Sequence, residues 1–493
     1  MVIRGRVIDD MYESPNASIR AGAALLKDGP EAFPADRKRN DVFFAAMFYI
    51  TVCGVVGAAV MGISETVKLQ ASPDPAVKSL ASDFMNRGVL GLVAAASTSV
   101  ILGIMFLQMC KMMPTCLVYA SLLLTPVLLI TMGAVLHLMN LTIAGIMFAV
   151  FGLIIATCMM WCWRDLIPFT VIVVETIAHV IQLYTAIMGI TVFGGILGMV
   201  WSILVVLATF GVYAMMFANA KEAEPSSSSE DPHLSQAAGY GIYFLIMLVM
   251  YWGSQVCRFV PHVSTCGVFG RWYYNKDLGS PVTSSLGFAM NKGFGPICFG
   301  AFVISVIRAL QAVAEAMEGN ETVEILGMVL KCLLSCVGEI VEFFSDLAYV
   351  QVAVRGFSFC EGVNATFALC KFQNIKPLLA GSLIGSVVTM TSLCCMLGAI
   401  AAGVAASWPY GTDSNSDPAA FTVCKITAVF SMLVGIIVGG GMMATISSGC
   451  SCLMVLYAED PEALERSRPA LAEAFEARMN DIGEGFELAS RSH

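Results

Sequence analysis

The chain has 493 residues, of which 57% are hydrophobic and 13% are charged, whereas soluble domains carry roughly 25% charged residues. The formal net charge is −9 and the mean hydropathy is +0.78. Too few polar residues are present to cover a soluble surface, so a soluble enzyme, a fibrous protein and a disordered chain are excluded. Nothing indicates nucleic-acid binding, since the longest basic run is Arg37-Lys38-Arg39.

Two polar tails flank the apolar body. Residues 1–40 hold 13 charged residues, and residues 458–493 hold another 13, which leaves 41–457 as the predicted transmembrane domain. The first apolar run, residues 42–63, is too long for the core of a cleavable signal peptide and is typical of a signal anchor. Seven Lys and Arg residues precede it, so the positive-inside rule predicts a cytosolic N-terminal tail.

Eleven apolar runs follow one another along the chain, and most are near the length of about 20 residues that a helix needs to cross a bilayer. None alternates with a period of two, which excludes the strands of an outer-membrane barrel. We therefore predict an all-α, polytopic membrane helix bundle with ten or eleven transmembrane helices. The runs lie near 42–63, 88–110, 115–137, 139–162, 166–189, 191–218, 240–260, 286–314, 325–354, 378–408 and 423–456.

The fifth run carries a polar stripe of Glu175, His179 and Gln182. Spacings of four and three place the three side chains on one helix face. Charges at membrane depth are costly and usually face a bundle interior or a wet cavity. Two interpretations are open: the stripe is a cation-attracting or proton-responsive wall of a substrate path, or it is a polar seam whose members satisfy one another.

The middle of the chain contains the strongest breaks. Residues 219–238, with the sequence EAEPSSSSEDP inside, are predicted to form a polar cytosolic loop. The stretch 240–274 is long for one simple span, and Pro261 is a point at which its helix can break. Glycines cluster inside other spans, at 194–198 and 435–441, where they favour close helix packing or allow bending.

Several aromatic side chains are expected at membrane depth, among them Trp201, Tyr243 and Trp252. A quaternary ammonium group is held well by aromatic faces through cation–π attraction. Trp161 and Trp272 lie at the ends of runs instead, a position typical of the interfacial aromatic belt. Trp201 and Trp252 are therefore the candidates for a buried cation site.

A second polar stripe, Glu339, Glu342 and Asp346, lies in the run 325–354 with spacings of three and four. Three acids on one face can form an electronegative vestibule for cations. Alternatively, the segment is an amphipathic helix at the membrane interface with its acids in water. Arg258 and Arg308 can pair with acids across helices, or their side chains can reach a membrane surface.

Sequence motifs for other chemistry are missing. The chain contains no HExxH, no GxxxxGK[ST] and no GxSxG motif, and its cysteines lack the paired spacing of a zinc site. We therefore predict no enzymatic activity, no metal site and no cofactor.

Four later segments resemble one known family, and their combination is more specific for it than any of the segments is alone. In this order and spacing the chain resembles the choline transporter-like solute carrier family, and GVFGRWYY most resembles its fungal branch, the pH-nine-sensitive proteins. The stretch RDLIPFTVIVVETIAHVI at 164–181 is similar to that family as well. The four segments are WGSQVCRFVPHVSTCGVFGRWYY at 252–274, NKGFGPICFGAFVISVIRAL at 291–310, AYVQVAVRGFSFCEGVNATFAL at 348–369 and YAEDPEALERSRPAL at 457–471.

The resemblance implies a multi-pass carrier of choline or a related cationic amine, in the plasma membrane or in an organelle membrane. Its partners are then a small cationic substrate and the lipid bilayer. A monovalent cation entering a negative interior gains about 2.3 kcal/mol per 100 mV, so uptake needs no coupling ion. The alternative is a non-transporting membrane scaffold or a lipid-handling protein.

For a carrier, we expect alternating access about a central site, with glycine-rich segments as flexible points. The ammonium group is predicted to contact Trp252 and Trp201, with the charge of Glu175 nearby. The full set of predicted substrate-binding residues is Trp252, Trp201, Glu175, His179 and Tyr243, and the predicted cation vestibule is Glu339, Glu342 and Asp346.

Overall fold

The computed structural model has only helices as regular structure in the residues that it describes, which confirms the predicted all-α bundle. These residues are 24–25, 31–34, 37–69, 87–162, 166–222, 232–276, 279–318, 324–372, 376–408 and 418–478. The helices considered below are α3 (Val42–Leu69), α5 (Val89–Met112), α6 (Pro114–Leu138), α7 (Thr142–Cys162), α8 (Ile167–Leu183), α9 (Ala186–Glu222), α10 (Pro232–Tyr273), α11 (Pro281–Met290), α12 (Phe294–Glu318), α13 (Glu324–Arg355), α14 (Phe359–Phe372), α15 (Lys376–Ser407), α16 (Pro418–Gly435), the π-helical turn η2 (Ile436–Gly440), α17 (Gly441–Glu459) and α18 (Pro461–Ser467).

Within the described residues, nine helical segments are long and apolar enough to cross a membrane, compared with the ten or eleven that we expected. Two expected spans fall short. Helix α8 has only 17 residues, and α13 has 32 residues but carries the second acidic stripe in its middle. Helix α13 nevertheless ends beside the segment that precedes α3, because Arg37 Nη1 donates to the carbonyl of Ala353 at 3.0 Å. Helix α13 is thus a further long helix beside the nine candidate segments of the described residues.

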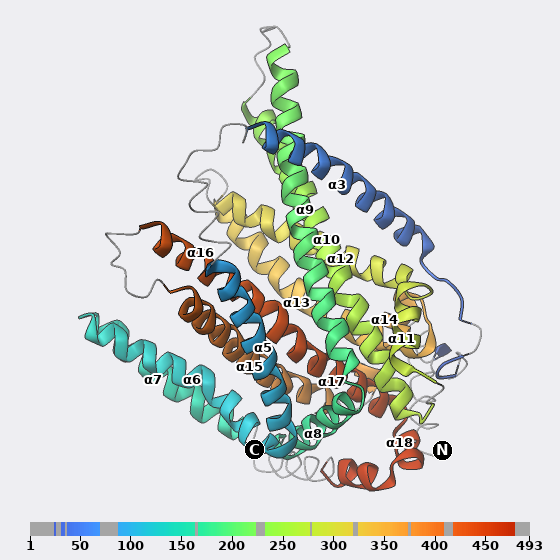
Figure 1. The fold of residues 1–493 in the computed structure, drawn as a ribbon. Helices are drawn as coiled ribbons and strands as arrows, with labels where there is room; N and C mark the ends of the chain where they lie inside the picture. The colour runs from blue at the N-terminus through green and yellow to red at the C-terminus, as the bar shows by residue number, and fades with distance from the viewer. Residues whose placement is uncertain are drawn as a thin grey trace.

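The described parts of the two tails lie at the same end of the bundle. Lys276, just after α10, donates to the carbonyl of Ala32 at 2.8 Å. Tyr273, the last residue of α10, donates its hydroxyl to the carbonyl of Asp460 at 2.9 Å. The described parts of both tails therefore meet the end of α10. We call this the lower end (Figure 1); the positive-inside rule predicts that it is cytosolic.

The predicted tails and loop are only partly described. Residues 1–23 and 479–493, and 223–231 of the predicted polar loop, lie outside the described residues. On either side of that gap, helix α9 extends to Glu222 and α10 begins at Pro232, so helix occupies much of the range predicted as loop.

Pro261 does not break its helix, contrary to the expectation, because α10 runs continuously over 42 residues. The proline lies in a close helix crossing: a Cβ on Gly194 of α9 would lie 2.4 Å from Pro261 Cγ. A second glycine-rich segment contains the π-helical turn η2 between α16 and α17, and a Cβ on Gly439 there would lie 2.3 Å from Cys395 Cβ. Glycines thus allow close helix packing at both places.

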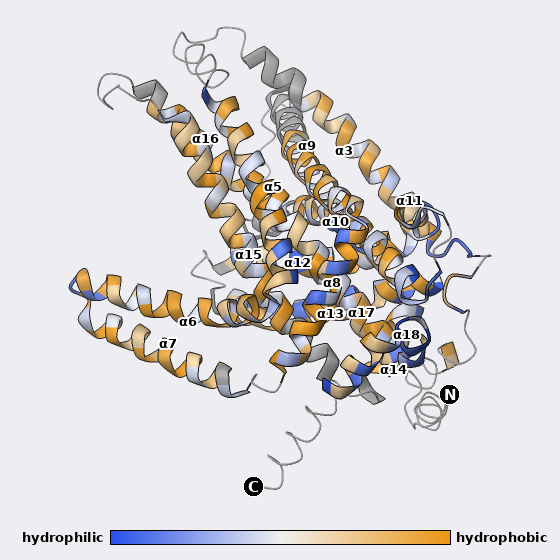
Figure 2. Ribbon diagram, turned by 60° about the horizontal axis from the view of Figure 1, so that its bottom comes forward, coloured by the Kyte–Doolittle hydropathy of each residue, from blue (hydrophilic) through white to orange (hydrophobic). Residues whose placement is uncertain are grey.

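Helix α17 is central and packs against α8, α9, α10, α13 and α15. Helices α3, α9, α10, α12 and α13 form a group on one side of it, and α5, α15 and α16 form a group on the other (Figure 1). The α6–α7 hairpin packs on the outside through α6. The two groups meet around α17 and diverge toward the upper end of the view in Figure 1. Figure 2 shows hydrophobic residues along most of α6 and α7 and hydrophilic ones gathered around α12 and α18.

Candidate functional site

The two tryptophans predicted to bind the ammonium group are buried core residues. Trp252 of α10 is 3% exposed, its indole nitrogen donates to the carbonyl of Cys298 at 3.0 Å, and the Phe48 ring packs edge-on at 5.3 Å. Trp201 of α9 is 7% exposed, donates to the carbonyl of Val249 at 3.2 Å and also contacts Phe48. The structure thus brings the two tryptophans together through Phe48 of α3. Their nitrogens and the ring surface around Phe48 are engaged in helix packing.

Glu175 and His179 lie in a different region. Both side chains are exposed on α8 and line a cavity of about 660 Å³ with Trp272 and Arg468. Trp272 follows Trp252 by twenty residues on α10, an axial distance of about 30 Å. The structure therefore does not bring Glu175 and His179 together with the two tryptophans, because α8 packs near the lower end of the bundle.

Tyr243 is also separate from the tryptophan pair. It is half-buried on α10 and precedes Trp252 by nine residues. At 3.6 residues per turn, nine residues correspond to about 14 Å of axial rise and to the opposite helix face. Tyr243 therefore does not share a cage with Trp252.

Two arginines and two acids form an ion-pair network across three helices. Glu342 of α13 pairs with Arg258 of α10 through one carboxylate oxygen and with Arg308 of α12 through the other, at 2.6 Å in the second pair. Arg258 also approaches Asp346 of α13 at 3.5 Å. We call these four residues the ionic seam. Of the two alternatives for Arg258 and Arg308, the structure shows pairing with acids across helices.

The ionic seam borders an accessible face. Its side chains are 48% exposed in Arg258, 41% in Arg308, 25% in Asp346 and 20% in Glu342. Glu339, one turn before Glu342, is exposed in the same stripe. Three carboxylates thus face two guanidinium groups, which leaves one negative charge. This charge balance suits a monovalent cation.

Two acceptor oxygens beside the seam are buried. Within the part of the chain that the structure describes, Asp346 Oδ1 and Gln255 Oε1 accept no hydrogen bond. Gln255 precedes Arg258 by three residues, so the two side chains share a face of α10. A buried acceptor without a donor is costly, so these oxygens are groups that a bound ligand or water can satisfy.

The seam continues toward the lower end through His262, one turn after Arg258. Its Nε2 donates to the carbonyl of Asp346 at 3.0 Å, and its Nδ1 lies 2.9 Å from the hydroxyl of Ser448 on α17. Neither His262 nor Ser448 was among the predicted site residues. The spacing of four between Arg258 and His262 is the sequence signal that points to the histidine.

A second ion pair closes the lower end. Arg355 of α13 pairs with Glu459 of α17, and their side chains are only 5% and 2% exposed. The other carboxylate oxygen of Glu459 accepts from Gln351 Nε2 at 2.7 Å. We call these three residues the lower clamp. It ties α13 to α17 below the ionic seam.

The chemistry of these regions is charge pairing and hydrogen bonding. Among the described residues, no group of three or more His, Cys, Asp and Glu side chains is arranged to hold a metal ion. The acids of the seam and the clamp are instead bound to arginines. Such groups can attract, hold and release a charged solute without any covalent step.

Several known proteins are similar in sequence to this chain. Protein PNS1 of Mycosarcoma maydis is 26% identical over 295 residues, which cover 57% of this chain and 55% of the relative. A CTL-like protein of Dictyostelium discoideum is 26% identical over 242 residues, 48% of this chain and 42% of the relative. Protein PNS1 of Debaryomyces hansenii is 27% identical over 242 residues, 47% of each chain. The chain thus spans about half the length of the curated relatives that it matches.

The match to a family model covers a larger part of the chain than these relatives do. Residues 146–462, well over half of the chain, match the model described as plasma-membrane choline transporter. This range includes α8, the ionic seam and the lower clamp. The resemblance drawn from the sequence motifs, including the fungal branch, is confirmed. The chain is a member of the plasma-membrane choline transporter family, a family of multi-pass membrane transport proteins.

Proposed function

We propose that the protein carries choline or a related monovalent cationic amine into the cell, driven by the membrane potential. The observation that carries this proposal is the charge balance of the ionic seam with Glu339, in which three carboxylates oppose two guanidinium groups. A bound monovalent cation neutralises the remaining charge. Membership of a choline transporter family supports the substrate class, and the plasma membrane in the family description supports the location.

The site that we propose lies at the seam and not at the tryptophan pair. The ammonium group is attracted by Asp346, and the hydroxyl of choline donates to the buried oxygen of Gln255. Tyr251, half-buried and seven residues before Arg258 on the same face of α10, supplies an aromatic ring nearby. Trp201 and Trp252 then act by packing α3, α9 and α10 around this site.

The membrane potential is a sufficient driving force for such a substrate. One positive charge that crosses to a negative interior gains about 2.3 kcal/mol per 100 mV, which corresponds to an accumulation of about fiftyfold. Uptake therefore needs neither a coupled ion nor ATP. The alternating-access cycle only has to open the seam to one side at a time.

The lower clamp is the gate that we assign to the cytosolic side. Arg355 and Glu459 hold α13 against α17 there, while the two helix groups diverge toward the upper end (Figure 1). We infer a state in which the seam is reached from the upper end. Opening toward the cytosol separates α13 from α17, and η2 is the flexible point next to α17. A departing cation then passes the cavity lined by Glu175 and His179.

Uptake of labelled choline into proteoliposomes with an imposed inside-negative potential tests the function. We expect saturable uptake that grows with the potential. Asp346→Asn should reduce uptake at low choline by about tenfold or more, the effect of about 1.4 kcal/mol of lost attraction. Glu465→Gln is the matched control, because Glu465 is an exposed carboxylate of α18 at the lower end and belongs to neither the seam nor the clamp.

Two outcomes would contradict the proposal. Full uptake by Asp346→Asn would move the cation site away from the seam. Absence of choline uptake by folded wild-type protein would favour the alternative, a membrane scaffold or lipid-handling protein.

A further inference from the structure

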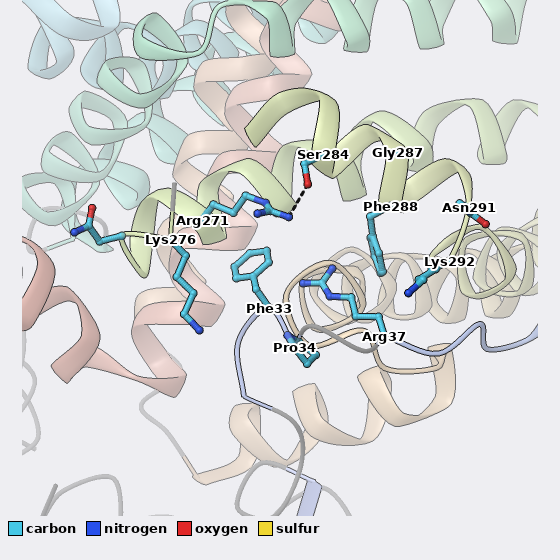
Figure 3. Close-up of a pocket in the computed structure, with 11 residues that line it drawn as sticks. Phe33, Pro34, Arg37, Arg271, Lys276, Ser284, Gly287, Phe288, Asn291 and Lys292 are labelled. Carbon is cyan, nitrogen blue, oxygen red and sulfur yellow. Dashed lines mark hydrogen bonds between the residues drawn. The ribbon is translucent and has the colours of Figure 1, made fainter. Parts of the chain in front are cut away.

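A basic cavity of about 690 Å³ opens at the lower end, between the segment before α3, the end of α10 and α11 (Figure 3). No carboxylate of the described residues lines it, whereas two phenyl rings and several amide and hydroxyl groups do. Its size admits a phosphorylated headgroup and not only a small ion. The cationic side chains of this basic cavity are Arg37, Arg271, Lys276 and Lys292.

The cavity lies at the level of the membrane boundary. Arg37 precedes the span that starts at Val42, and Arg271 and Lys276 flank the end of the span that finishes at Tyr273. Lys292 lies two residues before the start of α12. Three span ends therefore surround the cavity, where lipid headgroups lie. The positive-inside rule predicts that this is the cytosolic side, whose leaflet carries the anionic lipids.

The two guanidinium groups are held in place before any ligand binds. Arg37 donates to the carbonyls of Ala353 and Val354, at 3.0 and 2.9 Å, and Arg271 donates to Ser284 at 2.9 Å. The Phe33 ring lies between the two arginines, 4.9 Å from Arg37 and 4.8 Å from Arg271 (Figure 3). Neither guanidinium group therefore has to lose side-chain conformational freedom when an anion enters.

The cations of the cavity repel one another. Burial, followed by the charge of Arg271, lowers the pKa of Arg37 to about 10. Arg37 therefore stays protonated at neutral pH, at a cost that an anion in the cavity would remove. Lys292 is half-buried and makes no ion pair among the described residues, so its ammonium group adds a further positive charge. A cationic transport substrate would be repelled here.

We propose that the basic cavity binds the phosphate group of an anionic phospholipid headgroup from the cytosolic leaflet. Arg271 and Lys292 contact the phosphate, and Arg37 adds its charge while its N–H groups remain bonded to α13. The lipid is then a structural ligand that joins the segment before α3 to α10 and α11. This site is distinct from the ionic seam, and the proposal holds whether or not the protein carries choline.

The test uses the full chain in nanodiscs of phosphatidylcholine, with and without phosphatidylinositol 4-phosphate. We expect the phosphorylated lipid to bind saturably and to raise the unfolding midpoint. Arg271→Gln and Lys292→Gln should each weaken its binding by about tenfold, the loss of one charge-assisted contact. Arg39→Gln is the matched control, because it removes the same charge from an exposed residue of the same end that does not line the cavity.

The unfolding midpoint of each variant in pure phosphatidylcholine shows whether it is folded. If Arg271→Gln does not fold, Lys292→Gln decides the question. The proposal is overturned if the wild type shows no saturable binding, or if Arg39→Gln weakens binding as much as Lys292→Gln does, since attraction is then unspecific. An equal rise of the midpoint with inorganic phosphate in pure phosphatidylcholine would overturn the assignment to a lipid.

Discussion

The lower clamp and the ionic seam both join an arginine to a glutamate of a neighbouring helix, yet they differ in burial. In the clamp, Arg355 and Glu459 are 5% and 2% exposed, whereas Arg258 and Glu342 of the seam are 48% and 20% exposed. A buried charge that loses its partner is costly, whereas a hydrated one loses little. The clamp is therefore suited to hold one conformation, and the seam is suited to exchange partners with a passing cation.

Removal of the arginine from the clamp should have the largest effect on stability. Arg355→Met leaves the buried carboxylate of Glu459 with the amide of Gln351, and we expect the free energy of unfolding to fall by about 3–5 kcal/mol. Thermal unfolding of the purified protein measures this loss. The double variant Arg355→Met with Glu459→Leu should recover part of it, because no unpaired charge stays buried. If the single variant Arg355→Met is as stable as the wild type, burial does not make the clamp more important for stability than the seam.

Removal of the shared acid from the seam should affect stability less and uptake more. Glu342→Gln breaks two half-exposed pairs, for an expected loss of about 1–2 kcal/mol in unfolding free energy. Two guanidinium groups are then balanced by Asp346 and Glu339 alone, so the site loses its net negative charge and attracts a cation less. Choline uptake should fall by about tenfold or more.

Glu339→Gln sharpens the same experiment. It removes an exposed carboxylate that pairs with no arginine in the described part of the chain, so it should raise the KM for choline and leave the unfolding midpoint unchanged. Equal effects of Glu339→Gln and Glu342→Gln on the midpoint would show that the seam does not hold its helices together.

Among the ion pairs, the smallest effect on stability is expected at the upper end. Lys331 and Glu315 lie 3.5 Å apart with exposures of 42% and 59%, so Glu315→Gln should change the free energy of unfolding by about 0–1 kcal/mol. Because salt screens exposed charges, that small change should vanish at high ionic strength. The measurement is the unfolding midpoint of Glu315→Gln and of Arg355→Met at low and at high salt. The comparison shows how much more an ion pair contributes to stability when it is buried. A larger loss in Glu315→Gln than in Glu342→Gln would reverse the predicted order.

Sequence periodicity was reliable within single helices. The spacings of three and four placed Glu339, Glu342 and Asp346 on one face, and the structure keeps them in one stripe. Hydropathy was less reliable for α13, because a sequence window counts charges and does not recognise that Arg258 and Arg308 compensate them from neighbouring helices. Hydropathy alone therefore does not decide whether α13 is a span.

Contacts between distant segments could not be predicted. His262 meets Ser448 across 186 residues, and no local pattern marks that pair. Likewise, the face of α8 that carries Glu175 was predictable, but its neighbours Trp272 and Arg468 depend on how α8 packs at the lower end. The aromatic content of Trp201 and Trp252 indicated a cation site, although the same surfaces equally serve to pack helices.

The anchoring of the first segment has a consequence for biosynthesis. Arg37 bonds to the carbonyl of Ala353, and Asp41 accepts from the backbone of Phe359, at sequence separations of 316 and 318 residues. A ribosome that adds about 5–20 residues per second needs about 15–60 s to synthesise the intervening chain. Helix α3 thus enters the membrane long before the residues that fix its preceding segment exist. Docking of that segment is therefore a late step of assembly, and a chain that stops before α13 cannot complete it.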